Sequence, residues 1–254
     1  MSKVIGIDLG SRTTKIMQLE EREIQYLEIF DTGHDPLSQV RTTLKRLGSS
    51  PIMATGYGRH LLSENFGAQR VTEIKACARG IYQLSPNCRT ILDVGGQDCK
   101  VIRLNETGAV LDFEMNDRCA AGTGKFLEVM AQTFEMNISE FINTAKSAED
   151  YISINSMCTV FAESEAVSLI TAGKARNEIA LGLHMAIERR LYSMLKKMQP
   201  EDDIYFVGGG AKNDCLHGIL KDHLGKEIFR PAEPQFVVAL GAALLARENL
   251  DKLD

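Results

Sequence analysis

The stretch DLGSRTTK, residues 8–15, follows a short apolar run near the start of the chain. Gly10 permits a tight turn in which backbone N–H groups can approach phosphate oxygens closely. Lys15 supplies a cation, and Asp8 supplies a carboxylate able to face Mg²⁺ through water. Further hydroxyl and N–H donors come from Ser11, Thr13 and Thr14. The stretch predicts a turn that holds a triphosphate; the alternative is a β-hairpin with a surface lysine.

A second stretch, DVGGQD at residues 93–98, repeats this arrangement in mid-chain. Asp93 ends an apolar strand, where an unpaired carboxylate is costly unless it meets a metal ion or hydrogen-bond donors. Gly95 and Gly96 again remove side chains from the turn, and Gln97 is placed to orient an attacking water. The residues assigned to catalysis are therefore Asp8, Lys15, Asp93 and Gln97.

A third glycine-rich stretch, VGGGAKN at residues 207–213, ends a predicted strand and opens a helix, which suits the seating of adenosine. The residues assigned to it are Gly208, Gly209, Gly210 and Asn213. A run of three glycines is a weak signal alone, but the order of the three turns is informative. That order resembles the phosphate-1, phosphate-2 and adenosine segments of the actin/Hsp70/hexokinase superfamily.

The chain repeats one pattern, a strand, an aspartate, a glycine-rich turn and two more strands, near its start and again from residue 90. Strands that alternate with helices favour an α/β fold, here of two related halves with the nucleotide in the cleft between them. We expect one subdomain over residues 1–88 plus 236–254 and a second over residues 89–235. Helices are expected over residues 39–47, 72–84, 124–134, 164–172, 178–198 and 236–247.

Two of the six cysteines, Cys119 and Cys158, each lie just before a predicted helix. The partial positive charge and free N–H groups of a helix N-terminus favour a thiolate. A [4Fe–4S] cluster commonly needs four thiolates, so one chain would supply half of them and a two-fold dimer the rest. The alternative, commoner for a free cysteine, is a small buried apolar residue. Packing or surface thiols are expected at Cys77, Cys88, Cys99 and Cys215.

Four strings, DVGGQD, MNDRCAAGTGKFLEVMA, SMCTVFAESEA and PQFVVALGAALLA, closely resemble the BadF/BadG/BcrA/BcrD ATPase family. This family includes activators of 2-hydroxyacyl-CoA dehydratases and ATPase subunits of benzoyl-CoA reductases. The resemblance implies that Cys119 and Cys158 ligate one [4Fe–4S] cluster shared by a homodimer. It also implies ATP or ADP as ligand, with Mg²⁺ near Asp8 and Asp93. We also assign to cofactor binding Gly122 and Thr123.

The activity implied by the resemblance is ATP hydrolysis that drives single-electron transfer to a partner iron–sulfur enzyme. The partner can be a 2-hydroxyacyl-CoA dehydratase, a benzoyl-CoA reductase-like enzyme or a related cluster protein, and the expected donor is a ferredoxin or flavodoxin. One alternative is a sugar or small-molecule kinase of the same fold without a cluster, which would leave Cys119 and Cys158 unexplained. Another is a non-catalytic, actin-like assembly or sensor protein.

Composition excludes several other classes. The chain has 254 residues, 44% of them hydrophobic, with a net charge of −5 and no long basic run, so no nucleic-acid partner is expected. The most apolar run, 237–246, is shorter than the roughly 20 residues that span a bilayer. The N-terminal MSKVIGIDLG lacks the features of a signal peptide, so we expect a cytoplasmic protein without a membrane partner.

Overall fold

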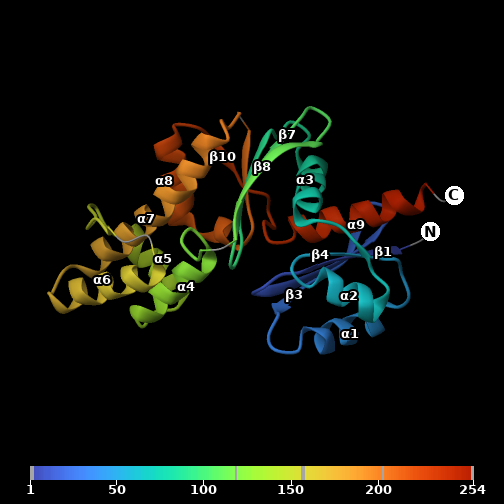
Figure 1. Cartoon of the computed structure of the whole chain (residues 1–254), viewed down its shortest axis with the longest axis horizontal. Coiled ribbons are helices and arrows are strands. Elements are labelled where there is room, and N and C mark those ends of the chain that lie inside the picture. The colour runs from blue at the N-terminus through green and yellow to red at the C-terminus, as the bar shows by residue number, and fades with distance from the viewer. Residues whose placement is uncertain (1–2, 118, 156–157, 202, 253–254) are drawn as a thin grey trace. The chain divides into compact units, whose positions relative to one another are not determined.

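The structure, a computed structural model, describes residues 3–117, 119–155, 158–201 and 203–252. It divides into two compact units, each with its own sheet and helices (Figure 1). Unit 1 comprises Met1–Arg89, Leu104–Asp112 and Gln235–Asp254, and unit 2 comprises Thr90–Arg103 and Phe113–Pro234. The chain therefore leaves unit 1, builds most of unit 2 and returns to unit 1 for its last helix.

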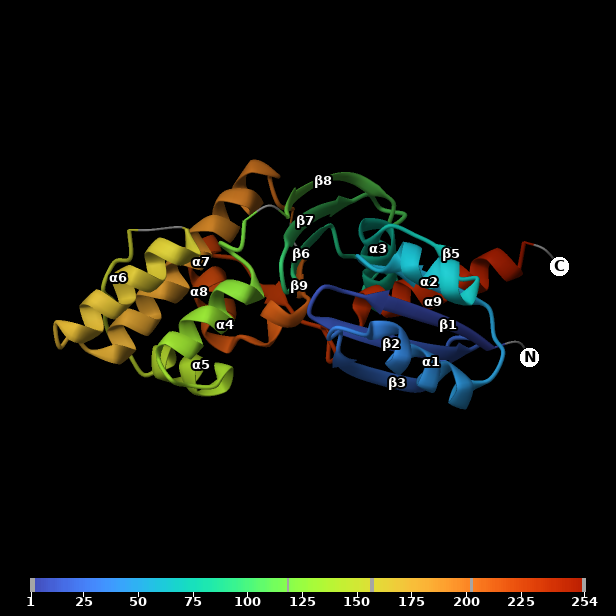
Figure 2. The same cartoon turned by 60° about the horizontal axis from the view of Figure 1, so that its bottom comes forward.

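The sheet of unit 1 has the strand order β3-β2-β1-β4-β5, and Figure 2 shows β3, β2 and β1 side by side. Its strands are β1 Lys3–Leu9, β2 Thr13–Glu20, β3 Glu23–Asp31, β4 Ile52–Thr55 and β5 Gln69–Arg70. The first three strands run antiparallel and match the strand, glycine-rich turn and two further strands predicted near the start of the chain, whereas β4 pairs with β1 in parallel. The parallel pairing brings the end of β4 beside the end of β1, where the first glycine-rich turn begins.

The helices of unit 1 are α1 Pro36–Leu47, α2 Arg59–Phe66, α3 Glu73–Leu84 and α9 Val237–Leu250. Helix α9 is apolar around most of its circumference because it is buried between β1 and α3. Glycines allow this close packing: a Cβ at Gly6 would lie 2.2 Å from the Ala239 carbonyl oxygen, and one at Gly241 would lie 1.7 Å from that of Ala76. The closing helix of the chain thus completes the core of the N-terminal sheet.

The sheet of unit 2 repeats this plan, with the order β10-β9-β6-β7-β8. Its strands are β6 Thr90–Val94, β7 Cys99–Leu104, β8 Val110–Asn116, β9 Ile204–Val207 and β10 Ile228–Phe229. Strand β6 takes the place of β1: it pairs antiparallel with the next strand and parallel with a later one. The duplication predicted from the sequence is therefore present in the strand order.

The helices of unit 2 are α4 Gly124–Thr133, α5 Ile138–Lys146, α6 Thr159–Thr171, α7 Arg176–Lys197 and α8 Asp214–Leu224, with a 3₁₀ turn at Gly209–Lys212. The long α7 buries Leu183, Ile187 and Leu191 at the centre of the core. Helix α6 begins at Thr159, earlier than the predicted residue 164, so it starts immediately after Cys158.

Candidate nucleotide turns and cysteine pair

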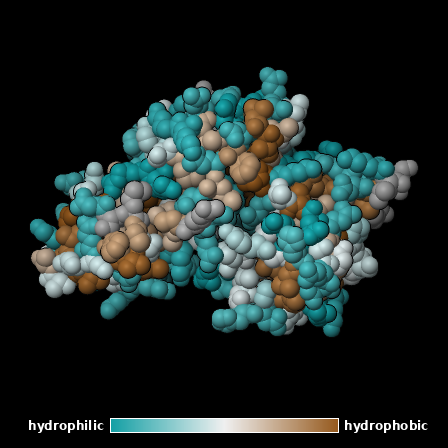
Figure 3. All heavy atoms as spheres, in the orientation of Figure 1, coloured by the Kyte–Doolittle hydropathy of each residue, from teal (hydrophilic) through white to brown (hydrophobic). Residues whose placement is uncertain are grey.

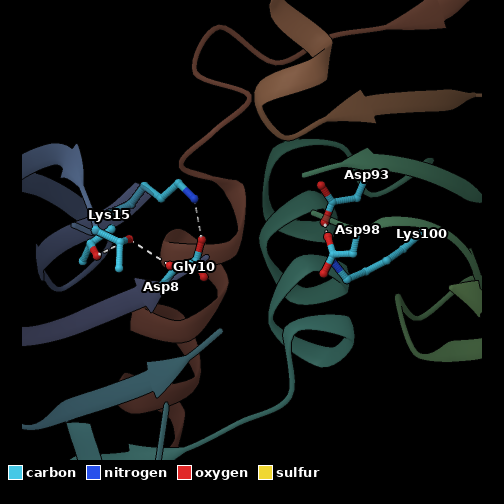
Figure 4. Close-up of polar contacts among 8 residues, drawn as sticks. Asp8, Gly10, Lys15, Asp93, Asp98 and Lys100 are labelled. Carbon is cyan, nitrogen blue, oxygen red and sulfur yellow. Dashed lines mark hydrogen bonds and ion pairs between the residues drawn. The ribbon is translucent and has the colours of Figure 1, made fainter. Parts of the chain in front are cut away.

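The first predicted turn is a hairpin between β1 and β2 that places Lys15 opposite Asp8 in the strand register. The Lys15 Nζ atom lies 3.0 Å from Asp8 Oδ2 (Figure 4). The Asp8 side chain is 5% exposed, and the lysine side chain is 14% exposed rather than spread over the surface. The hairpin therefore holds a largely buried ion pair at the turn.

The hydroxyl groups of Thr14 and Thr32 stabilise this turn through hydrogen bonds inside the protein. The buried Thr14 hydroxyl lies 3.1 Å from that of Thr32, which in turn donates to the Gly10 carbonyl at 2.8 Å. Ser11 and Thr13 are half-buried. The Thr14 side chain is thus engaged inside the protein. Thr32, which sequence reasoning does not mark, ties β3 to the turn.

The second turn contains a buried charge cluster of Asp93, Asp98 and Lys100, of which Lys100 was not predicted from the sequence. Lys100 faces Asp93 in the β6–β7 register, just as Lys15 faces Asp8 in unit 1. Its ammonium lies 2.8 Å from Asp98 Oδ1 and 3.6 Å from Asp93 Oδ2, and its side chain is only 2% exposed (Figure 4). The matching Asp-to-Lys spacing in the two turns was the available signal for Lys100.

The third turn packs directly against the second. Gly208 has a φ of +80°, and a Cβ there would lie 2.5 Å from Asp93 Oδ1. A Cβ at Gly210 would lie 2.5 Å from a methyl carbon of Val94. There is no space for a side chain at either position. The two glycines therefore allow the start of the 3₁₀ turn to lie against the end of β6. Two of the predicted segments are therefore adjacent within unit 2.

Asn213 serves the start of α8. Its Oδ1 accepts from the Leu216 N–H at 2.9 Å, and its Nδ2 lies 3.0 Å from His184 Nε2. His184 Nδ1 lies 2.8 Å from the Ala180 carbonyl oxygen, which can only accept, so Nδ1 carries the proton and Nε2 accepts from Asn213. Burial lowers the pKa of His184 to about 4, which keeps the ring neutral.

The loop that carries Cys119 is held by Asn116 at the end of β8. The Asn116 amide donates to the carbonyl oxygens of Cys119 and Ala121, both at 3.0 Å. Gly122 follows with a φ of +85°, and the Thr123 hydroxyl donates to the Ala120 carbonyl at 2.7 Å. The loop is fixed from inside while the Cys119 side chain remains exposed.

The start of α4 is hydrogen-bonded to the second glycine-rich turn. The Gly124 N–H donates to the Gly95 carbonyl and the Lys125 N–H to the Gly96 carbonyl, each at 2.9 Å. These N–H groups belong to the first turn of a helix, where no intrahelical partner exists. These two hydrogen bonds join the Gly95–Gly96 turn to the start of α4, directly after the Cys119 loop.

Cys158 is the N-cap residue of α6, and its side chain is exposed. The other four cysteines are buried, and burial raises the pKa of the Cys99 and Cys215 thiols to about 11, which disfavours a thiolate. Of the two exposed cysteines only Cys158 adjoins a helix, because α4 begins at Gly124, five residues after Cys119. Both thiols are exposed, which fits cluster ligation, but two are too few for a four-thiolate cluster. Across the described ranges no group of three or more His, Cys, Asp or Glu gathers as a metal site.

The first turn also fits a cation. The Asp8 Oδ1 atom is buried and has no hydrogen-bond partner among the residues that the structure describes. Its second oxygen, Oδ2, accepts a hydrogen bond from Lys15, which fixes the orientation of the carboxylate and so the position of Oδ1. A magnesium ion or one of its water ligands would satisfy this oxygen.

In the described parts of the chain, no helix has the length and apolarity to cross a membrane.

Two related mixed sheets, each with an Asp–Gly turn at the end of its central strand, define an ATPase-type α/β protein of the actin/sugar-kinase fold. Residues 5–246 match the BadF/BadG/BcrA/BcrD ATPase family, and the chain belongs to this family. It is 38% identical to the activator of lactoyl-CoA dehydratase from Anaerotignum propionicum, with 98% of each chain covered. It is 36% identical to the 2-hydroxyisocaproyl-CoA dehydratase activator from Clostridioides difficile, with 95% and 94% covered.

Solved structures confirm the fold. Component A of (R)-2-hydroxyglutaryl-CoA dehydratase from Acidaminococcus fermentans superposes with a TM-score of 0.92 at 33% identity, covering 99% of this chain and 100% of the other. The Clostridium difficile activator with bound ADPNP gives 0.90 at 35% identity, covering 99% and 98%. A glucokinase of the ROK family from Streptomyces griseus gives 0.63 at 10% identity, over 97% and 100%, a likeness of fold alone.

Proposed function

We propose that the chain is an ATP-dependent activator that passes single electrons to a partner enzyme of the 2-hydroxyacyl-CoA dehydratase class. The observation that carries the proposal is the pair of hydrogen bonds between the Gly95–Gly96 turn and the start of α4, the helix that follows the Cys119 loop. Full-length similarity to dehydratase activators supports the partner class. The similarity to a benzoyl-CoA reductase polypeptide from Thauera aromatica, at 27% identity, is weaker.

Nucleotide hydrolysis is assigned to the two Asp–Gly turns. Lys15 neutralises phosphate charge, Gln97 orients the attacking water, and backbone N–H groups at Gly10, Gly95 and Gly96 bind phosphate oxygens. Asp8 and Asp93 would hold Mg²⁺ through water, and the ion would offset the charge of the β- and γ-phosphates when bound. The third turn, Gly208–Gly210 with Asn213 behind it, is the proposed seat of adenosine.

The electron-carrying centre is assigned to Cys119 and Cys158, together with the same pair from a second copy. A [4Fe–4S] cluster bound there would supply a one-electron donor, recharged by a ferredoxin or flavodoxin. Val160 and Phe161 follow Cys158 and are 64% and 66% exposed. Apolar surface lies over the α6 part of unit 2 (Figure 3). Large exposed apolar side chains beside a ligating thiol are suited to a subunit interface.

Coupling between the two sites is assigned to the start of α4. A nucleotide phosphate that binds the Gly95–Gly96 turn repositions the carbonyls that receive the Gly124 and Lys125 N–H groups. The Cys119 loop moves with them, which changes hydrogen bonding and solvent around the thiolate, and these factors set the potential of a cluster. Hydrolysis then returns the turn to its resting position and prevents back-transfer.

The test is anaerobic purification followed by separate loss of each site. Cys119→Ser and Cys158→Ser are expected to lose the iron–sulfur absorbance and to retain nucleotide binding, whereas Asp8→Ala and Asp93→Ala keep the cluster and lose ATP turnover. The buried Cys77→Ala serves as control and keeps both properties. A colourless, monomeric wild-type protein after reconstitution with iron and sulfide would disprove the proposal.

A further inference from the structure

Two buried polar atoms lie side by side in the sheet register of unit 1 and lack hydrogen-bond partners. They are Asp8 Oδ1 and the Thr55 hydroxyl, unpartnered among the described residues. Asp8 is 4% exposed and Thr55 is 0% exposed. Native proteins rarely leave such atoms unsatisfied, because each has lost its water on folding and gained nothing in return. Two in one place indicate a ligand.

The strand register explains why they are neighbours. Asp8 and Thr55 are paired positions of the parallel strands β1 and β4. Paired residues of adjacent strands project from the same face of a sheet, and the strands are about 4.8 Å apart. Both residues lie at the ends of their strands, so both side chains stand at the edge from which the first glycine-rich turn departs.

Gly56 keeps the space beside Asp8 open. It has a φ of +86°, and a Cβ there would lie 2.7 Å from Asp8 Oδ1 and 2.4 Å from the Leu9 carbonyl oxygen. Any other residue would fill the volume next to the free carboxylate oxygen. The neighbouring turn is held in place by the Gly58 N–H, which donates to the same Leu9 carbonyl at 3.0 Å.

The chemistry of the pair limits the ligand. A carboxylate oxygen only accepts hydrogen bonds, whereas a hydroxyl both donates and accepts. A water molecule satisfies both, donating one hydrogen to Asp8 Oδ1 and the other to the Thr55 hydroxyl oxygen. Lys15 already occupies Asp8 Oδ2, so the arrangement selects a neutral donor, such as a water of a hydrated divalent cation, rather than a second ammonium.

We infer that Thr55 is a further binding residue of the ATPase site, which holds a water ligand of the Mg²⁺ ion together with Asp8. This inference rests on the proposed ATPase function and extends its metal site to β4. The water held by Thr55 can have two sources. The inferred source is a water ligand of Mg²⁺, and the alternative is a structural water that is present without the metal.

The decisive variant is Thr55→Val, which replaces the hydroxyl by a methyl group of similar shape. Without divalent cation, its urea midpoint should equal or exceed that of wild type, because an unsatisfied buried hydroxyl is removed. Binding of Mn²⁺ in the presence of ADP, measured by electron paramagnetic resonance, should weaken about tenfold, as for other residues that hold metal-bound water. Thr55→Ser should restore Mn²⁺ binding.

Thr43→Val is the matched control from the same unit. Thr43 is 2% exposed, but its hydroxyl donates to Glu28 Oε2 at 2.5 Å. This variant should lower the urea midpoint and leave Mn²⁺ binding unchanged, the reverse of Thr55→Val. The full-length, cluster-loaded protein is used throughout.

Two results would overturn the inference. If Thr55→Val lowers the urea midpoint and binds Mn²⁺ like wild type, Thr55 holds a structural water, and the proposed ATPase function is unaffected. If wild type itself binds no Mn²⁺ with ADP, both the metal role of Thr55 and the proposed ATPase function are wrong.

Discussion

At the scale of single residues, Lys100 has the most demanding environment. Its side chain is 2% exposed, and its ammonium lies between two nearly buried carboxylates, Asp93 and Asp98. Removal of a buried cation leaves its partners uncompensated, which costs far more than loss of a surface ion pair. The lysine therefore fixes both carboxylates at the end of β6.

We expect Lys100→Met to lower the free energy of unfolding by about 3 kcal/mol, measured by urea denaturation. Lys125→Met is the control, because its lysine side chain is 48% exposed and 3.8 Å from Glu128, and it should cost less than about 1 kcal/mol. Adding Asp98→Asn to Lys100→Met should recover part of the loss. Equal losses for the two lysine variants would contradict the role given to Lys100.

His184 makes a testable contribution to acid sensitivity. Its pKa is about 4 in the folded protein, lowered from 6.5 by burial. Between these values the unfolded chain binds more protons, so stability is complete above about pH 6.5 and falls as the pH decreases toward 4. The full loss amounts to roughly 3 kcal/mol, from about 1.4 kcal/mol per pKa unit.

Unfolding curves at about pH 7 and about pH 5 check this expectation. His184→Gln cannot take up a proton in this range, while its amide can still donate to Ala180 and accept from Asn213. The variant should therefore lose less stability than wild type between the two pH values. A pH dependence identical to that of wild type would show that protons bind elsewhere.

The parts of the site that follow from the sequence are those formed by neighbouring positions. Asp8 and Lys15 face each other because they flank one hairpin, and DLGSRTTK contains both. Thr55 meets Asp8 only through the parallel pairing of β4 with β1. His184 meets Asn213 only because α7 packs on α8. Such contacts arise from tertiary structure, and no local pattern reveals them.

At the scale of elements, the start of α4 connects a nucleotide turn to a cysteine loop. A Cβ at Gly124 would lie 3.1 Å from the Gly95 carbonyl oxygen, tighter than an ordinary contact. Gly124→Ala should therefore push the turn and the helix apart by a few tenths of an ångström. The helix itself should persist, because alanine favours helix over glycine.

We expect Gly124→Ala to keep its cluster and its nucleotide affinity but to reduce the nucleotide-dependent shift in cluster potential, by about 1 kcal/mol of coupling. Midpoint potentials measured with and without an ATP analogue test this. Gly218→Ala on α8 is the control, since no atom lies within 4 Å of its added Cβ. A full-sized shift in Gly124→Ala would exclude the α4 start as the connection.

Sequence patterns predicted neither α2 nor α5, and they predicted α6 only from residue 164. Helix α2 buries only Leu62 and therefore has no apolar stripe. Helix α6 buries only Ala162 and Ala166, so its first turn, with Val160 and Phe161 exposed, lacks periodicity. Helix α5 did carry a signal, a capping box formed by Asn137 and Glu140. The strands and long helices were predictable because burial imposes a clear period on them.

At the scale of the whole molecule, the two units repeat one strand order and one Asp–Lys pairing. The repeats differ in what surrounds the lysine: Lys15 contacts one carboxylate, and Lys100 lies between two. The duplicated fold thus provides two glycine-rich turns of the same design with different charge. Unit 2 alone adds the exposed thiols Cys119 and Cys158.

Helix α9 has a consequence for synthesis. It covers β1, and the absence of a side chain at Gly6 allows the α9 backbone to approach the strand closely. The two segments are nevertheless separated by almost the whole sequence. While a ribosome is still translating the residues between them, the N-terminal sheet has one face without its cover. Most of unit 2 emerges earlier than α9 and has its own core. Strand β1 thus reaches its native surroundings only after α9 has left the ribosome, later than most of unit 2.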